Sequence, residues 1–82
     1  MSGGSHRRRL VLRSIEDPSG DRCVDIFRRP DGSFGYEEYR RDAEDPRGWQ
    51  PVGGYDRRRF TEEVSALADA EATIGWLSAS MK

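Results

Sequence analysis

Residues 22–41 read RCVDIFRRPDGSFGYEEYRR, and this stretch decides the fold. Two runs rich in β-branched and aromatic residues, 22–29 and 33–41, flank Pro30-Asp31-Gly32, which predicts two strands joined by a tight turn. Proline fixes φ at the first turn position, aspartate tolerates the second, and glycine takes the left-handed third position. We therefore expect a type I turn with a G1 bulge. A two-residue Asp-Gly turn is the alternative, and it would shift the register by one.

The bulged turn predicts which side chains share a face of the hairpin. In this register Phe27 lies opposite Gly35 and would cover its bare backbone. The shifted register would place Asp25 opposite Glu38, a like-charge pair that costs stability, and this favours the bulge. The predicted core face carries Val24, Ile26, Phe34 and Tyr36, and the second face carries Cys23, Phe27 and Tyr39 with Asp25 and Glu37 between them.

The sequence on either side of the hairpin predicts a tail, a first strand and an irregular edge strand. Residues 1–9 are dominated by glycine, serine and arginine, so we expect a disordered tail. Residues 10–15 form a short run that fits a strand, and turn residues follow it. Residues 42–48 are a polar loop, and residues 49–55 (WQPVGGY) predict an edge strand weakened by its proline and glycines.

A single helix is expected after the strands. Thr61 is the predicted N-cap, and Glu62 and Glu63 suit the positive end of the helix dipole. Gly75 weakens the far end, which we place between residues 73 and 78, with 79–82 frayed. The predicted apolar stripe is Phe60, Val64, Leu67, Ala70, Ile74 and Leu77, with Trp76 beside it.

These elements predict one α+β domain over residues 10–78, in the order β-β-β-β-α. A three- to four-stranded antiparallel sheet would pack against one C-terminal α-helix. With 82 residues the chain has room for one core, and an apolar fraction of 34% makes that core thin. The aromatic residues lie in patterned segments, which argues against a disordered chain.

Charge and targeting signals give few positive indications. The net charge of −1 indicates no general attraction to nucleic acid or to an anionic membrane. No apolar run is long enough to span a membrane, and no secretory signal is visible, so we expect a cytoplasmic protein. Lys82 is the only lysine among 14 basic side chains. This arginine bias is explained either by a GC-rich coding sequence or by selection for bidentate contacts.

The residue types that carry most enzyme chemistry do not form a constellation in the sequence. His6 lies in the predicted tail without a fixed partner, and Cys23 lies in a strand, where free cysteines are usually buried apolar residues. Glu37 and Glu38 are adjacent in a strand and so point to opposite faces. We therefore predict a non-enzymatic protein with no catalytic, metal or cofactor site.

Two binding surfaces are nevertheless suggested by the pattern. The first is a weak anion site at Gly53, Gly54, Arg57 and Arg58, where glycine N–H groups precede the helix. The second is an interaction surface on the uncovered sheet face. We predict that the chain is a protein-interaction module that uses this surface. The partner could be a second copy of the chain, which would then self-associate through the same face. A nucleic-acid-binding module that uses the arginine and aromatic side chains of the hairpin is the alternative. The predicted interaction surface comprises Phe27, Tyr39, Arg28, Arg29 and Arg40.

The hairpin sequence also carries a resemblance. Residues 27–42 read FRRPDGSFGYEEYRRD, and Gly48-Trp49 and Val52-Gly53-Gly54-Tyr55 follow. In this pattern the chain resembles a family of small bacterial proteins without an assigned activity. The resemblance covers residues 22–77 and implies the same sheet-plus-helix shape. It implies no activity and no catalytic residues.

Overall fold

Four antiparallel strands pair in chain order, β1-β2-β3-β4, and two helices follow them. The computed structural model describes residues 9–80, so residues 1–8 of the predicted tail (1–9) and the last two residues of the chain lie outside it. Arg9, the last residue of that predicted tail, is held in place by an ion pair with Asp56 at 3.2 Å, so the tail prediction is wrong there. The predicted α+β class, an antiparallel sheet with C-terminal helical structure, is confirmed. The elements are β1 (Leu10–Glu16), β2 (Arg22–Arg28), β3 (Phe34–Arg40), β4 (Gln50–Pro51), the 3₁₀ turn η2 (Tyr55–Arg57), α1 (Glu63–Thr73) and α2 (Gly75–Ser80).

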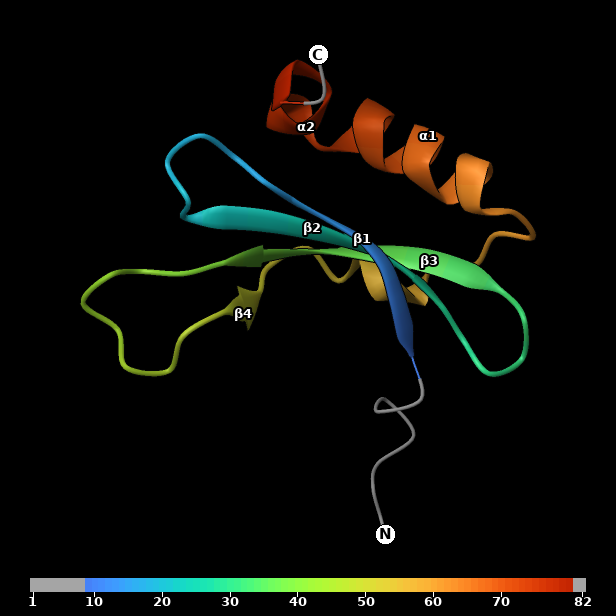
Figure 1. Cartoon of the computed structure of the whole chain (residues 1–82), viewed down its shortest axis with the longest axis horizontal. Coiled ribbons are helices and arrows are strands. Elements are labelled where there is room, and N and C mark those ends of the chain that lie inside the picture. Colours follow the sequence, from blue (N-terminus) through green and yellow to red (C-terminus); the bar gives the residue numbers. More distant parts are fainter. Residues whose placement is uncertain (1–8, 81–82) are drawn as a thin grey trace, which may run out of the picture.

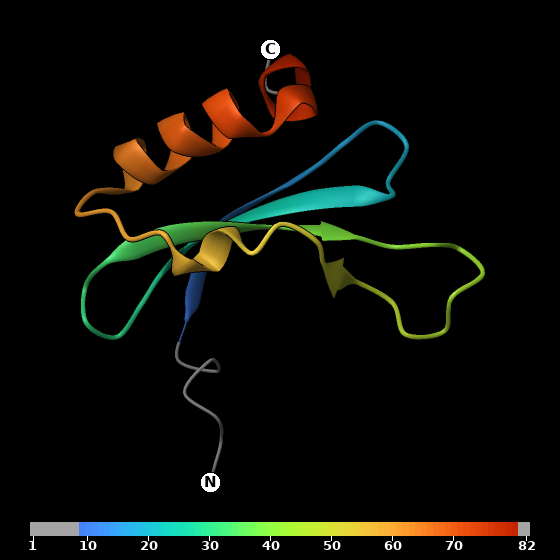
Figure 2. The ribbon, with the colours of Figure 1, turned by 180° about the vertical axis from the view of Figure 1, so that it is seen from behind.

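The helices and the segment before them occupy different places around the sheet. Figures 1 and 2 show α1 and α2 along one face of the sheet, while β4 and η2 follow the course of β3. Phe60 then pairs with Phe34 at the other end of β3. The chain from β4 to Phe60 therefore borders the outer edge of β3 at both of its ends.

The hairpin between β2 and β3 has the predicted bulged register. The N–H of Arg29 donates to the Ser33 carbonyl at 2.8 Å, and Gly32 N–H donates to the Arg29 carbonyl at 2.9 Å. Gly32 has φ +88°, the left-handed conformation that a side chain would make costly. Phe27 pairs with Gly35, as the turn chemistry predicts.

Avoidance of like charges does not distinguish this register from the alternative. The observed register pairs Asp25 directly with Glu37, which is also a pair of like charges. Each carboxylate has its own hydrogen-bond donors: Asp25 receives the Ser14 hydroxyl at 2.8 Å, and Glu37 receives the N–H groups of Gly53 and Asp56 at 3.2 and 3.1 Å. The turn, and not the avoidance of like charges, sets the register.

The core lies between the sheet and the helices, as expected, and the predicted helix stripe contributes to it except at Val64. Val64 is 66% exposed, whereas Ala66 is fully buried. The small alanine side chains let the helix approach the sheet closely, so the rotation of α1 favours them over Val64. The buried core cluster comprises Val24, Ile26, Tyr36, Ala66, Ala70, Ile74 and Leu77, with Phe34 partly buried beside it.

The helix boundaries also differ from the sequence prediction. Glu62 (φ −139°, ψ 149°), not Thr61, is the N-cap, and its side chain makes no capping hydrogen bond. The predicted single helix is interrupted at Ile74, whose φ of −103° and ψ of 105° are extended. This break turns Ile74 into the core and lets α2 begin at Gly75. Within residues 9–80, neither helix has the length and apolar character needed to cross a bilayer.

Candidate functional site

The second face of the hairpin is closed at its Phe27 end, contrary to the prediction of an open surface. Phe27 is only 1% exposed. The Arg9 and Arg29 guanidinium carbons lie 4.0 and 5.0 Å from the centre of its ring. A Cβ built on Gly35 would come within 2.9 Å of the ring, so Phe27 does cover this glycine as expected. Because it is buried, Phe27 cannot form part of an interaction surface.

Arg29, a second residue of the predicted surface, is turned inward. Its guanidinium donates to the carbonyls of Phe34 at 3.1 Å and Arg58 at 3.3 Å, and to that of Asp56. Burial, followed by the repulsion of neighbouring arginines, lowers the pKa of Arg29. Arg29 therefore fastens the hairpin to the segment 56–58 and is not free for a partner.

The remaining predicted surface residues are not brought together. Arg28 pairs with Phe34 and Arg40 pairs with Arg22, so these arginines lie at opposite ends of the hairpin. Both belong to the helix-side face, whereas Tyr39 is on the other face. Tyr36, an aromatic residue of the same hairpin, is fully buried and is not part of the exposed surface.

The predicted anion site already binds an anion that belongs to the chain itself. The N–H groups of Gly53 and Asp56, together with that of Glu38 at 2.9 Å, donate to the carboxylate of Glu37, which is 2% exposed. Gly54, with φ +65°, shapes the turn. The N–H of Gly53, which the prediction assigns to an external anion, is therefore used by a carboxylate of the chain itself.

Of the two arginines in the predicted anion site, one binds other side chains and the other is exposed. Arg58 donates to Asp69 at 2.6 Å and to the hydroxyl of Tyr36 at 3.0 Å. The same hydroxyl donates to Asp69 at 2.6 Å, so these three side chains join the end of η2 to β3 and α1. Arg57 is exposed in η2. Arg58 is a structural residue, and it does not face the glycine N–H groups.

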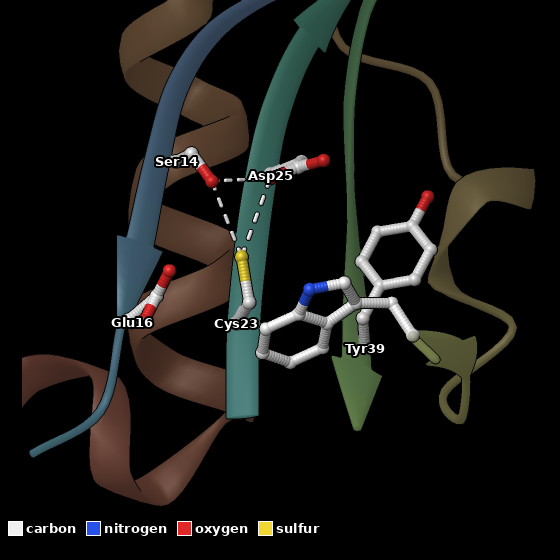
Figure 3. A pocket seen from close by; sticks show the side chains of 6 residues that line it. Ser14, Glu16, Cys23, Asp25 and Tyr39 are labelled. Carbon is white, nitrogen blue, oxygen red and sulfur yellow. Dashed lines mark hydrogen bonds between the residues drawn. The ribbon is translucent and has the colours of Figure 1, made fainter. Parts of the chain in front are cut away.

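An open pocket of about 270 Å³ lies at the other end of the second face, where Tyr39 is only half-buried. Figure 3 shows that its side chains come from three adjacent strands. Trp49, in the loop before β4, adds a further aromatic ring. The lining residues are Ser14, Glu16, Cys23, Asp25, Tyr39 and Trp49.

The polar side chains in this pocket hold one another in place. Ser14 Oγ lies 2.8 Å from Asp25 Oδ1 and 3.2 Å from Cys23 Sγ, and the thiol lies 3.5 Å from the same carboxylate oxygen (Figure 3). Burial raises the pKa of the Cys23 thiol, and the charges of Asp25 and Glu16 raise it further. The cysteine is thus held as a neutral thiol, the less reactive form.

Cys23 is expected to react slowly with alkylating reagents. At pH 8 iodoacetamide should modify the folded chain at least about tenfold more slowly than the urea-unfolded chain, because the raised pKa reduces the thiolate fraction and burial limits access. Mass spectrometry of time points measures both rates. Equal rates in the two states would show that the thiol is exposed and not perturbed.

The carboxylates and aromatic rings that line the pocket suit a cationic ligand. Glu16 is exposed, and its carboxylate makes no hydrogen bond or ion pair with residues 9–80 in the structure. Burial and then the charge of Asp25 raise the pKa of Tyr39, while the charge of Arg9 acts in the opposite direction. Trp49 already packs against one guanidinium, that of Arg41, whose carbon lies 4.5 Å from the ring centre. Carboxylates beside aromatic faces are typical of sites that accept ammonium or guanidinium groups.

Sequence reasoning missed this pocket because its members are far apart in the chain. Ser14 meets Asp25 only through the register of β1 on β2, which a bulge between Val11 and Arg13 alters further along the strand. The one local signal is the alternation of Ser14 and Glu16, which places both on one strand face. Within residues 9–80, no three His, Cys, Asp or Glu residues come together in a way that could hold a metal ion.

No protein-family model, curated protein or solved structure matches this chain. The resemblance to a family of small bacterial proteins therefore stays a prediction.

Proposed function

We propose that the chain is a small protein-interaction module, and that its pocket receives an arginine side chain of the partner protein. The observation that carries the proposal is the combination of two carboxylates, Glu16 and Asp25, with the rings of Tyr39 and Trp49 around one open cavity. None of the lining side chains is basic. A guanidinium would stack on the rings and share its N–H groups with the carboxylates.

The available acceptor atoms support this orientation. Asp25 Oδ1 is used by Ser14 and Cys23, while Asp25 Oδ2 accepts no hydrogen bond from residues 9–80. The carboxylate of Glu16 is similarly open to a donor from outside. Two carboxylates together with two aromatic rings suit the flat, multiply donating guanidinium better than the rounded ammonium of lysine.

The same geometry disfavours an enzymatic reading of the pocket. Cys23 is held as a thiol, as the raised pKa indicates, and the nearby carboxylates would oppose formation of a thiolate. Ser14 donates to a carboxylate, without a base that is arranged to take its proton onward. Binding is therefore the activity that these residues support best.

N-acetyl-arginine methylamide is the direct probe, with the citrulline analogue as its neutral isostere. We expect the arginine compound to bind at least about fivefold more tightly, because the charge adds about 1 kcal/mol through the rings and carboxylates. NMR titration of the Trp49 indole and the Cys23 amide would follow binding.

Variants then separate the pocket from general charge attraction. Glu16→Gln should weaken arginine binding several-fold, whereas Glu44→Gln, in the exposed loop after β3, should leave it unchanged. Equal affinity for arginine and citrulline would overturn the proposal, and so would equal effects of the two variants.

A further inference from the structure

The two outer strands of the sheet differ in whether another segment pairs with their free edge. The edge of β3 is bordered by β4 and by Phe60, whose main chain exchanges hydrogen bonds of 2.8 and 3.0 Å with Phe34. By contrast, no element within residues 9–80 pairs with the outer edge of β1, which is seven residues long. Its first three side chains, Leu10, Val11 and Leu12, are 58%, 50% and 38% exposed. A long apolar edge of this kind is a surface for adding another strand.

The hydrogen-bond pattern identifies the main-chain groups that this edge offers. Asp17 N–H donates to the Arg22 carbonyl at 3.0 Å, so Asp17 bonds toward β2. In an antiparallel pair such positions alternate, so Ile15 also bonds toward β2. The N–H and C=O groups of Ser14 and Glu16 therefore point away from the sheet, where another strand could reach them.

We infer that β1 pairs antiparallel with β1 of a second copy of this chain, with Ser14 opposite Glu16 of the second copy. A two-fold axis then passes beside Ile15, which faces its own symmetry mate. The two four-stranded sheets become one continuous sheet. The pairing uses the edge of β1 and does not depend on what the pocket binds.

Charge complementarity selects this register. It sets Arg13 opposite Asp17 of the second copy, and two-fold symmetry repeats that ion pair on the other side of Ile15. Arg13 is exposed and makes no ion pair with another described residue, so its charge is free for this contact.

The neighbouring registers fit less well. With Glu16 opposite Glu16, two like charges would meet, and Ser14 would face Pro18, which has no N–H to donate. With Ser14 opposite Ser14, Glu16 would face Leu12, where the bulge between Val11 and Arg13 breaks the alternation of outward groups. The register about Ile15 alone combines two hydrogen-bonded pairs with two ion pairs.

The pairing has a consequence for the pocket. Ser14 and Glu16 are both lining residues, so the second copy would bring its Glu16 beside Ser14 of the first. The two pockets would then lie on the same face of the joined sheet, close to the two-fold axis. A dimer of this form presents two acidic pockets side by side. It would therefore bind a partner that carries two suitably spaced arginine side chains more tightly than a partner that carries a single one.

Self-crosslinking tests the register directly. In a Cys23→Ser background, Ile15→Cys should form a dimer with itself under mild oxidation, because facing residues of a non-hydrogen-bonded pair have the Cα spacing of a disulfide. Val11→Cys is the matched control: it is an exposed position of the same strand that keeps both ion pairs and lies far from its own copy in this register, so it should stay monomeric on a non-reducing gel. Circular dichroism must show that both variants are folded.

Sedimentation equilibrium of the unmodified chain supplies a second readout. A small interface of this kind predicts weak association, so the monomer–dimer transition should fall between about 10 µM and 1 mM. Arg13→Glu should shift it to at least about tenfold higher concentration, and Arg28→Glu should not. A chain that remains monomeric throughout overturns the inference, as does crosslinking of Val11→Cys as efficient as that of Ile15→Cys.

Discussion

Glu37→Gln is expected to destabilise the fold by about 2–3 kcal/mol, a loss caused by one neutralised carboxylate. Three main-chain N–H groups, those of Glu38, Gly53 and Asp56, converge on this side chain at 2.9–3.2 Å. Hydrogen bonds to a charged acceptor are the stronger kind, and a glutamine NH₂ would turn a donor toward one of these donors. For a domain of this size, that loss lowers the melting temperature by roughly 10–20 °C.

Urea unfolding at pH 7 measures the free energy, and hydrogen exchange locates the damage. The amides of Gly53 and Asp56 should lose protection in Glu37→Gln before those of β2 do. Glu44→Gln, in an exposed loop, should leave the midpoint unchanged. If both variants unfold at the same urea concentration, the buried carboxylate does not hold the segment 53–56 to the sheet.

The hairpin register could be predicted because the turn alone determines it. Glycine at position 32 is required by a φ of +88°, and the pairing of Phe27 with Gly35 follows from the turn by counting. Such local chemistry is written in consecutive residues. The fold class also follows, since four strand-like runs before one helical run leave few arrangements.

The state of the second face could not be predicted in the same way. A sequence shows that Arg29 is charged, and charged side chains are usually placed at the surface. Only the folded structure places Asp56 and Arg58 beside the hairpin. There their carbonyls, together with that of Phe34, accept hydrogen bonds from the Arg29 guanidinium. The burial of Phe27 depends in turn on that guanidinium and on Arg9.

The helix stripe shows how a periodic pattern can be right overall and wrong at one position. Ala70, Ile74 and Leu77 of the predicted stripe are buried, and Phe60 and Leu67 pack against the core. Only position 64 is replaced, by position 66. Hydrophobicity favours Val64 over Ala66, whereas close packing on a sheet favours the smaller side chain. The structure follows packing, with Ala66 buried and Val64 exposed.

The pocket could not be predicted from the sequence either, because Trp49 comes to line it only through the tertiary fold.

Arg29→Met is expected to cost about 2–3 kcal/mol, whereas Arg28→Met should cost under about 0.5 kcal/mol. Arg29 donates to the carbonyls of Phe34, Asp56 and Arg58, and methionine keeps the apolar stem while removing every one of these donors. Arg28, the preceding residue, is exposed. Arg29→Met and Arg28→Met are a matched pair, because both change the composition and the net charge of the chain in the same way. Urea unfolding measures the free energy of unfolding of each variant.

Arg29→Lys extends this test to the arginine bias of the whole chain. A lysine ammonium is compact and cannot reach the carbonyls of Phe34, Asp56 and Arg58 together, so this variant should recover less than half of the stability lost in Arg29→Met. Full recovery would mean that position 29 needs only a positive charge, and the bias there would reflect coding sequence alone. Partial recovery, with weaker protection of the Gly53 and Asp56 amides, would show that the planar fork of arginine is what binds the segment 56–58 to the hairpin.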